Sequence, residues 1–196
     1  MNKGEQTQER IVERALQLAT RDGLDGLTIN RLATELGLSK SGLFAHFGSK
    51  EELQLQVLQA AARHFEESVV RPALTKPRGE ARLRALFERW LAWSNDPAWP
   101  GGCIFVASAV EFDDRPGPLR EYLVFAQGAF LATLAKAARL AVEAGHFCPD
   151  TDPEQFGFDL YAIVLGYHHA KRLMRDPRAE ERARTAFDRL IQSVRA

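Results

Sequence analysis

Three helix-start signals follow one another closely near the beginning of the chain, and they constrain the fold more than any other feature. Thr28, Ser39 and Ser49 each precede an apolar run, and each can accept a hydrogen bond from an amide of a first helical turn. Gly37 can end the first of these helices in the left-handed conformation. The pattern predicts two short helices joined by a tight turn, with a third helix starting after Ser49.

The rest of the chain also has a helical pattern. Apolar residues recur at intervals of three and four, and the sequence has no strand-like alternation bounded by hairpin signals. We therefore expect an all-α fold of about nine helices. The expected ranges include 7–21, a long fourth helix from Ser49 to Pro72, 103–112 and 119–145, with Asp152-Pro153 and Asp176-Pro177 starting the last two helices.

The long fourth helix suggests a division into two domains. It keeps its apolar stripe up to Pro72, so it is long enough to connect two bodies. The expected domains are residues 1–52, a three-helix helix-turn-helix domain, and residues 53–196, a larger helical domain.

Composition and charge limit the classes of partner and the compartment. The 196 residues include 26 Lys and Arg against 26 Asp and Glu, so a chain that binds DNA must gather its positive charge locally. Cys103 and Cys148 lie far apart without metal-ligand spacing, as is usual in a reducing cytosol. The N-terminus lacks an apolar signal core, and the stretch 160–167, taken as the longest apolar run, is too short to cross a membrane. We expect a cytoplasmic protein.

The second short helix of the motif has an outward face of unusually small residues. Leu43 and Phe47 are expected to be buried, one turn apart. The residues expected outside or on the flanks are Lys40, Ser41, Gly42, Phe44, Ala45 and His46. A face this small suits close approach to the major groove of DNA, where an alanine or phenylalanine can touch thymine methyl groups. Lys40, Lys50 and the free amides at the helix starts after Thr28 and Ser49 can hold phosphates.

The run from Leu27 to Leu53 resembles the DNA-binding signature of the tetracycline-repressor (TetR) family. By that resemblance, Asn30 and positions 40–42 lie near base edges, while Thr28, His46 and Lys50 hold the DNA backbone. Two positions depart from the family pattern: Phe44 stands where tyrosine is usual, and Ala45 stands where an aromatic residue or histidine is common. Loss of the tyrosine hydroxyl removes one possible phosphate contact, so direct base readout is expected to be sparse.

The resemblance also implies a homodimer on a palindromic operator and a small-molecule effector that releases the DNA. The final two helices would pair with those of a second copy, through Tyr161, Leu165, Ala183, Phe187, Leu190, Ile191 and Val194. The effector pocket would lie among Phe87, Trp90, Trp93, Phe105, Tyr122, Phe125, Tyr161 and His168. Aromatic residues at helical spacing also suit an ordinary core, and a final apolar stripe also suits the core of one chain, so both alternatives stay open.

Two other classes of function compete with a repressor. An enzyme would have to use His168, His169 and Cys148 or the acidic group Glu111, Asp113 and Asp114, but the sequence contains no nucleophile elbow, phosphate loop or metal-ligand pair. We expect no catalytic residue, metal or cofactor. The alternative is a helical protein-interaction module that retains the motif without regulatory DNA binding, since only Lys3 and Arg10 supply positive charge before the first apolar face.

Overall fold

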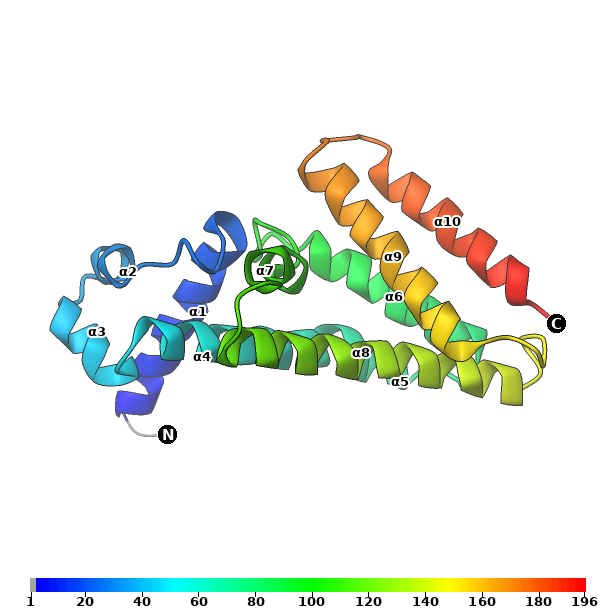
Figure 1. Cartoon of the computed structure of the whole chain (residues 1–196), viewed down its shortest axis with the longest axis horizontal. Coiled ribbons are helices and arrows are strands. Elements are labelled where there is room, and N and C mark those ends of the chain that lie inside the picture. The colour runs from blue at the N-terminus through cyan, green and yellow to red at the C-terminus, as the bar shows by residue number, and fades with distance from the viewer. Residues whose placement is uncertain (1–2) are drawn as a thin grey trace. The chain divides into compact units, whose positions relative to one another are not determined.

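The structure is a computed structural model and describes residues 3–196. In this part of the chain it contains ten α-helices, one π-helical segment and, in place of strands, a single isolated β-bridge between Phe147 and Arg195 (Figure 1). The elements are α1 (Lys3–Asp22), α2 (Ile29–Leu36), α3 (Lys40–Phe47), α4 (Lys50–Phe65), η1 (Glu66–Val70), α5 (Arg71–Leu74), α6 (Glu80–Ser94), α7 (Ile104–Phe112), α8 (Pro118–Glu143), α9 (Pro153–Arg172) and α10 (Ala179–Val194). The all-α prediction is confirmed. Because α4, η1 and α5 are continuous in the chain, they correspond to the single long fourth helix that was expected.

The chain divides into two compact units. The first contains residues up to His64 together with 96–125, and the second contains 65–95 together with 126–196. The segment 96–125, which the expected boundary put in the second domain, therefore packs with the N-terminal helices. The helices α4 and α8 each begin in the first unit, and the chain continues from both into the second.

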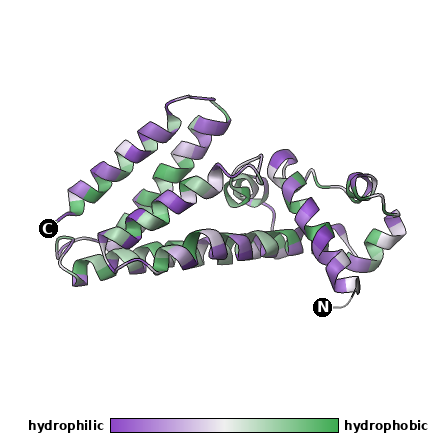
Figure 2. Cartoon of the chain, turned by 180° about the vertical axis from the view of Figure 1, so that it is seen from behind, coloured by the Kyte–Doolittle hydropathy of each residue, from purple (hydrophilic) through white to green (hydrophobic). Residues whose placement is uncertain are grey.

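Apolar stripes form the core of the first unit. The stripe expected on α1 is buried, with Ala15 and Leu16 fully covered. Gly23 ends this helix at a φ of +85°, and its amide donates to the Ala19 carbonyl oxygen at 3.0 Å. Leu43 on α3 and Leu53 on α4 are also fully buried. These buried residues belong to the core of the first unit, and Figure 2 shows hydrophobic residues alternating with hydrophilic ones along the ribbons.

The end of the long fourth helix differs from the expectation of a regular helix. The amide of Arg71 donates to the carbonyl of Glu66, which is the spacing of a π-helix. Pro72 follows and has no amide hydrogen to donate to the Ser68 carbonyl, as a regular helix would require. That carbonyl oxygen accepts from Arg89 Nη1 at 3.2 Å instead. The proline and the arginine together account for the change of helical type.

The core of the second unit is formed by α6, the second half of α8, α9 and α10, with Leu134 and Ala138 of α8 fully buried. Phe87 on α6 and Phe187 on α10 are buried, and their rings stack at 4.1 Å between centroids with an interplanar angle of 14°. Arg84 on α6 binds Asp188 on α10 at 2.7 Å and Glu80 at 2.7 Å. The last helix therefore packs on α6 through the stacked rings and the Arg84–Asp188 ion pair, and a surface ion pair of this kind contributes only about 0–1 kcal/mol.

Helix starts near the C-terminus follow the sequence prediction in one case and shift in the other. Asp152 caps α9, and its Oδ1 accepts from the amides of Glu154 and Gln155 at 2.9 Å and 3.1 Å. Asp176 instead caps a turn, and α10 begins later, at Ala179. The Asp-Pro pair therefore marked a chain reversal before α10 rather than the first residues of the helix itself.

The longest apolar segment is α8, not residues 160–167 as the sequence had led us to expect. By length and composition alone α8 could cross a membrane, which is weak evidence because core helices of soluble proteins pass the same test. Cys103 is buried, and Cys148 is half-buried, with its Sγ donating to the Arg195 carbonyl oxygen at 3.2 Å.

Candidate nucleic-acid interface

The helix-turn-helix is shaped by local hydrogen bonds at its three helix starts and at Gly37. The Thr28 hydroxyl accepts from the Arg31 amide at 3.3 Å, and the Ser39 hydroxyl accepts from the Gly42 amide at 3.0 Å. Gly37 has a φ of +63°, which lets the next residue, Leu38, donate to the Ala33 carbonyl oxygen at 2.9 Å. The turn between α2 and α3 is therefore closed by the glycine that the sequence singled out.

Burial along α3 follows the predicted helical projection. Leu43 and Phe47 are 0% and 5% exposed and anchor the helix. Lys40, Ser41, Phe44 and Ala45 are exposed, and Gly42 and His46 are half-buried beside them. Phe44, with 47% of its surface exposed, is a large apolar side chain presented to solvent on an otherwise small face. Such a face can lie against the edges of base pairs, where apolar contact with thymine is favourable.

The two lysines expected at the DNA backbone have different surroundings. Lys40 is exposed, and no ion pair or hydrogen bond of its ammonium is found among the described residues. The Lys50 Nζ donates to the Asp25 carbonyl oxygen at 2.7 Å and lies 3.4 Å from Asp25 Oδ1. Arg31 is likewise paired, with Asp22 at 2.9 Å. The cation most available to a phosphate or a base on this motif is therefore Lys40.

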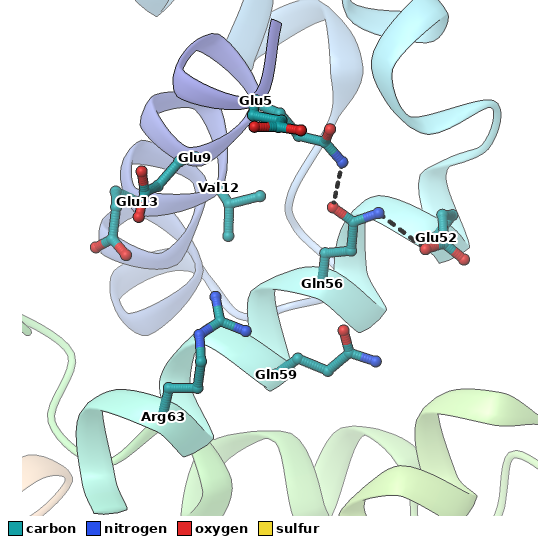
Figure 3. Close-up of a pocket in the computed structure, with 9 residues that line it drawn as sticks. Glu5, Glu9, Val12, Glu13, Glu52, Gln56, Gln59 and Arg63 are labelled. Atoms are coloured by element: carbon teal, nitrogen blue, oxygen red, sulfur yellow. Dashed lines mark hydrogen bonds between the residues drawn. The ribbon is translucent and has the colours of Figure 1, made fainter. Parts of the chain in front are cut away.

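Acidic residues gather on a different part of the first unit. A groove with a volume of about 330 Å³ is lined by residues of α1 and α4, which Figure 3 shows as sticks. Its lining includes Glu5, Gln8, Glu9, Val12, Glu13, Glu52, Gln56, Gln59 and Arg63. Gln8 Nε2 donates to Gln56 Oε1 at 2.8 Å, and Gln56 Nε2 donates to Glu52 Oε1 at 2.9 Å. Carboxylates repel phosphate, so this groove is less suited to a DNA backbone than the small exposed face of α3.

Family models match both parts of the chain. The model of bacterial regulatory proteins of the tetR family matches residues 11–57, which include the whole helix-turn-helix. The model of the tetracyclin repressor-like C-terminal domain matches residues 79–187, more than half of the chain. The chain belongs to the TetR family of transcriptional regulators. This confirms the resemblance seen in residues 27–53, and it confirms the expectation of no enzymatic activity because members of this family are DNA-binding regulators.

Individual proteins resemble the chain over different lengths. The transcriptional regulator TcmR of Streptomyces glaucescens is 28% identical over 122 residues, which are 60% of this chain and 52% of TcmR. The match thus spans about half of that relative. A TetR regulator from Chloroflexus aurantiacus has the same fold, with a TM-score of 0.85, 25% identity and coverage of 98% of this chain and 96% of the other. AibR, whose structure is a complex with isovaleryl coenzyme A and operator DNA, shares the fold at 22% identity, with a TM-score of 0.74 and coverage of 95% and 97%.

The residues expected at the effector pocket of this TetR-family chain fall into both units. Phe105, Tyr122 and Phe125 belong to the first unit, and Phe125 is 69% exposed, so its place in an effector pocket stays a prediction. The others belong to the second unit: Phe87, Trp90, Trp93, Tyr161 and His168. Phe87 is covered by the Phe187 ring and is a core residue of that unit.

A compact aromatic cluster remains in the second unit. The Trp90 ring meets Phe130 edge-on at 4.8 Å and Tyr161 at 5.4 Å between centroids. Trp90 Nε1 and His168 Nε2 are buried and have no hydrogen-bond partner within the described residues. Burial lowers the pKa of His168, which favours the neutral imidazole. These two nitrogen atoms are buried polar groups of the second unit that could bind a ligand.

The residues expected at the dimer interface divide into a core set and a surface set. Ala183, Phe187 and Ile191 are 5%, 2% and 0% exposed within a single chain, so the expectation that they face a partner is wrong. Their stripe is covered by the chain's own helices, including α6 through Phe87. Tyr161, Leu190 and Val194 are half-buried, and Leu165 is 39% exposed. Phe158 on α9, which the sequence reading missed, is 64% exposed.

Proposed function

We propose that the chain is a sequence-specific DNA-binding transcriptional regulator of the bacterial cytoplasm, a repressor that a small-molecule effector releases from its operator. The observation that carries this proposal is the small exposed face of α3, held between capped helix ends in a chain of the TetR family. Residues 1–52 would bind DNA, and residues 53–196 would bind the effector and the second subunit.

In this proposal α3 lies in the major groove. Asn30, Lys40, Ser41 and Gly42 approach base edges, and Phe44 and Ala45 touch thymine methyl groups. Thr28 and His46 hold phosphates together with the free amides at the start of α2. The Lys50 ammonium is already bound to the Asp25 carbonyl oxygen, so it contributes to DNA-backbone binding only with the hydrogens that this contact leaves available. Because few long polar side chains reach the bases, the deformability of the operator supplies part of the specificity.

A second copy of the chain is the proposed partner, packed against α9 and α10. Phe158 and Leu165 lie two turns apart on α9, and both are exposed in the single chain. An apolar helix face of this kind is suited to a two-fold interface, in which the same surface of each copy meets its counterpart. Leu190 and Val194 at the margin of α10 would extend the contact. Two recognition helices held in this way would bind a palindromic operator.

The proposed effector is a small, largely apolar molecule with a hydrogen-bond acceptor. Trp90 Nε1–H can only donate, so a buried ligand beside it has to present an oxygen or another acceptor. The neutral His168 can donate or accept through Nε2. AibR binds isovaleryl coenzyme A, which sets a precedent for an effector that joins an apolar acyl group to carbonyl oxygens.

The DNA-binding proposal is tested with purified protein and a random-sequence duplex library. The recovered duplex is titrated at two salt concentrations with wild type, Lys40→Ala and the matched control Lys171→Ala, which removes an exposed lysine from α9. We expect an enriched palindrome bound as a dimer. Lys40→Ala removes one lysine from each subunit of the dimer, so it should raise Kd at least about tenfold and reduce the salt slope by about two, with no change for Lys171→Ala. Weak, equal binding to all duplexes would favour the protein-interaction module instead.

The effector proposal is tested by thermal denaturation in a library of small carboxylic acids, esters and thioesters. A compound that binds the native state raises Tm in a concentration-dependent manner. Trp90→Phe keeps an aromatic ring and removes the donor, so it should abolish the shift produced by any true ligand of this site. A shift that survives in Trp90→Phe would place the ligand elsewhere.

A further inference from the structure

Glu111, in the acidic group near the end of α7, binds the backbone of the turn between α1 and α2. Glu111 Oε1 accepts from the Leu24 amide at 3.2 Å, and Glu111 Oε2 accepts from the Asp25 amide at 2.8 Å. One carboxylate thus holds two successive amides in the turn between α1 and α2. Gly23 permits this approach, because a Cβ atom at that position would lie 2.6 Å from Glu111 Oε1.

The carbonyl groups of the same two turn residues are bound by α4. Gln54, 4% exposed, donates from Nε2 to the Leu24 carbonyl oxygen at 2.7 Å, and the Lys50 ammonium donates to the Asp25 carbonyl oxygen at 2.7 Å. All four backbone polar groups of Leu24 and Asp25 therefore have side-chain partners on α4 and α7. The turn is therefore positioned by these side chains and does not depend on secondary structure within the turn.

A second contact joins the segment after α7 to the turn. Arg115 Nη1 donates to Asp25 Oδ2 at 3.0 Å. Together with Lys50 it lowers the pKa of Asp25, so this carboxylate stays charged well into the acid range.

The turn leads directly into the helix-turn-helix. Thr28, the cap of α2, follows Asp25 by three residues, so a displacement of the turn displaces the start of α2. The two helices that hold the turn also lead along the chain into the second unit, α4 through η1 and α7 through α8. The turn is therefore the place where a movement of α7 relative to α4 would act on the DNA-binding motif.

We propose that Glu111 is the positioning residue through which α7 sets the place of α2 and α3 for operator binding. The inference rests on the proposed function, since it concerns the regulation of the same DNA-binding surface. Glu111 itself contacts no DNA. It acts by fixing the turn that precedes the motif.

The test uses the full-length chain with Glu111→Gln, which preserves side-chain size but replaces one accepting oxygen with a group that donates. The matched control is Asp114→Asn, which removes an exposed charge from the same segment. A second variant, Arg115→Gln, removes the other contact of this segment with Asp25 and should act in the same direction more weakly. Amide hydrogen exchange is measured in the free proteins, and Kd is measured for the library-selected operator and for a random duplex of equal length.

The inference predicts a selective effect of Glu111→Gln. Exchange should accelerate at least tenfold at residues 24 and 25 and in α2, with unchanged exchange in α9 and an unchanged thermal midpoint. Operator Kd should rise about tenfold while random-duplex Kd stays the same. Asp114→Asn should match wild type in every measurement.

Other outcomes overturn the inference. Unchanged exchange at residues 24 and 25 would show that Glu111 does not hold the turn. Parallel weakening of operator and random-duplex binding, or faster exchange throughout the first unit, would show that Glu111 merely stabilises the fold. If wild type selects no operator, the proposed function fails, and exchange in α2 alone decides whether Glu111 positions the motif.

Discussion

The assignment of Phe187 to the core of one chain gives a large effect that can be measured. Phe187→Ala removes a ring that is 2% exposed and stacked on the fully buried Phe87. Truncation of a buried phenylalanine costs about 3–5 kcal/mol, and partial collapse of the cavity sets the position within that range. Since Phe87 also loses its stacking partner, we expect about 4 kcal/mol, a large part of the roughly 5–15 kcal/mol that stabilises a typical domain.

The matched control is Phe158→Ala, which removes the same side chain from an exposed position on α9. In a single chain this change should lower the free energy of unfolding by less than about 1 kcal/mol, because the ring is 64% exposed. If the proposed dimer uses this face, Phe158→Ala should instead weaken association. The two phenylalanines therefore separate folding from assembly.

Urea unfolding over a hundredfold range of protein concentration distinguishes the two effects. Phe187→Ala should lower the urea midpoint at every protein concentration. Phe158→Ala should instead weaken the increase of the urea midpoint with protein concentration and lower the mass measured by sedimentation. The reasoning is refuted if Phe187→Ala shifts the monomer–dimer equilibrium and leaves the midpoint of the dilute protein unchanged.

Three further predictions concern packing, pH and capping. Gly101→Ala should destabilise the protein by about 2 kcal/mol or more in urea unfolding, because its Cβ would lie 1.2 Å from the Thr20 carbonyl oxygen. The control Gly128→Ala, in an open part of α8, should stabilise it by up to about 1 kcal/mol, and equal effects would contradict the packing described here. Burial lowers the pKa of His168 in the folded chain below the value of 6.5 that it has in the unfolded chain. Between these two pKa values the unfolded chain therefore binds more protons than the folded chain, and the free energy of unfolding falls as the pH drops below 6.5. Tm should therefore drop between pH 7.5 and 5.5, less so in His168→Gln, and an identical drop in both would exclude His168 as the source. Ser39→Ala removes the cap of α3 and should cost about 1 kcal/mol of unfolding free energy in urea, whereas an unchanged value would mean that the Gly42 amide finds another partner.

The sequence predicted well those features that depend on neighbouring residues. The starts after Thr28, Ser39 and Asp152 and the end at Gly37 are set by hydrogen bonds within a few residues, so their signals are local. The buried and exposed sides of α3 follow from the helical period alone. These local features also determine most of the candidate DNA-binding face.

Features that depend on distant residues could not be predicted. The apolar stripe of α10 was expected to meet a second copy, because a stripe reveals that a surface is covered but not which surface covers it. The π-helical segment depends on Arg89 as well as on Pro72. Glu111 was seen only as part of an acidic group, and its partner Leu24 lies 87 residues away along the chain. Similarly, nothing near Lys50 in the sequence indicates that Asp25 binds it.

The way in which the turn at Leu24 and Asp25 is held also limits how this chain can be recombined. A chimera that grafts residues 1–52 onto the effector domain of another regulator would leave behind Gln54 and Glu111, and with them the partners of three backbone groups in the turn. Extending the graft to residue 57, where the family model ends, restores only Gln54. A DNA-binding module that is transferred from this protein to another regulator therefore has to consist of two separate segments, the N-terminal helices and residues 96–125.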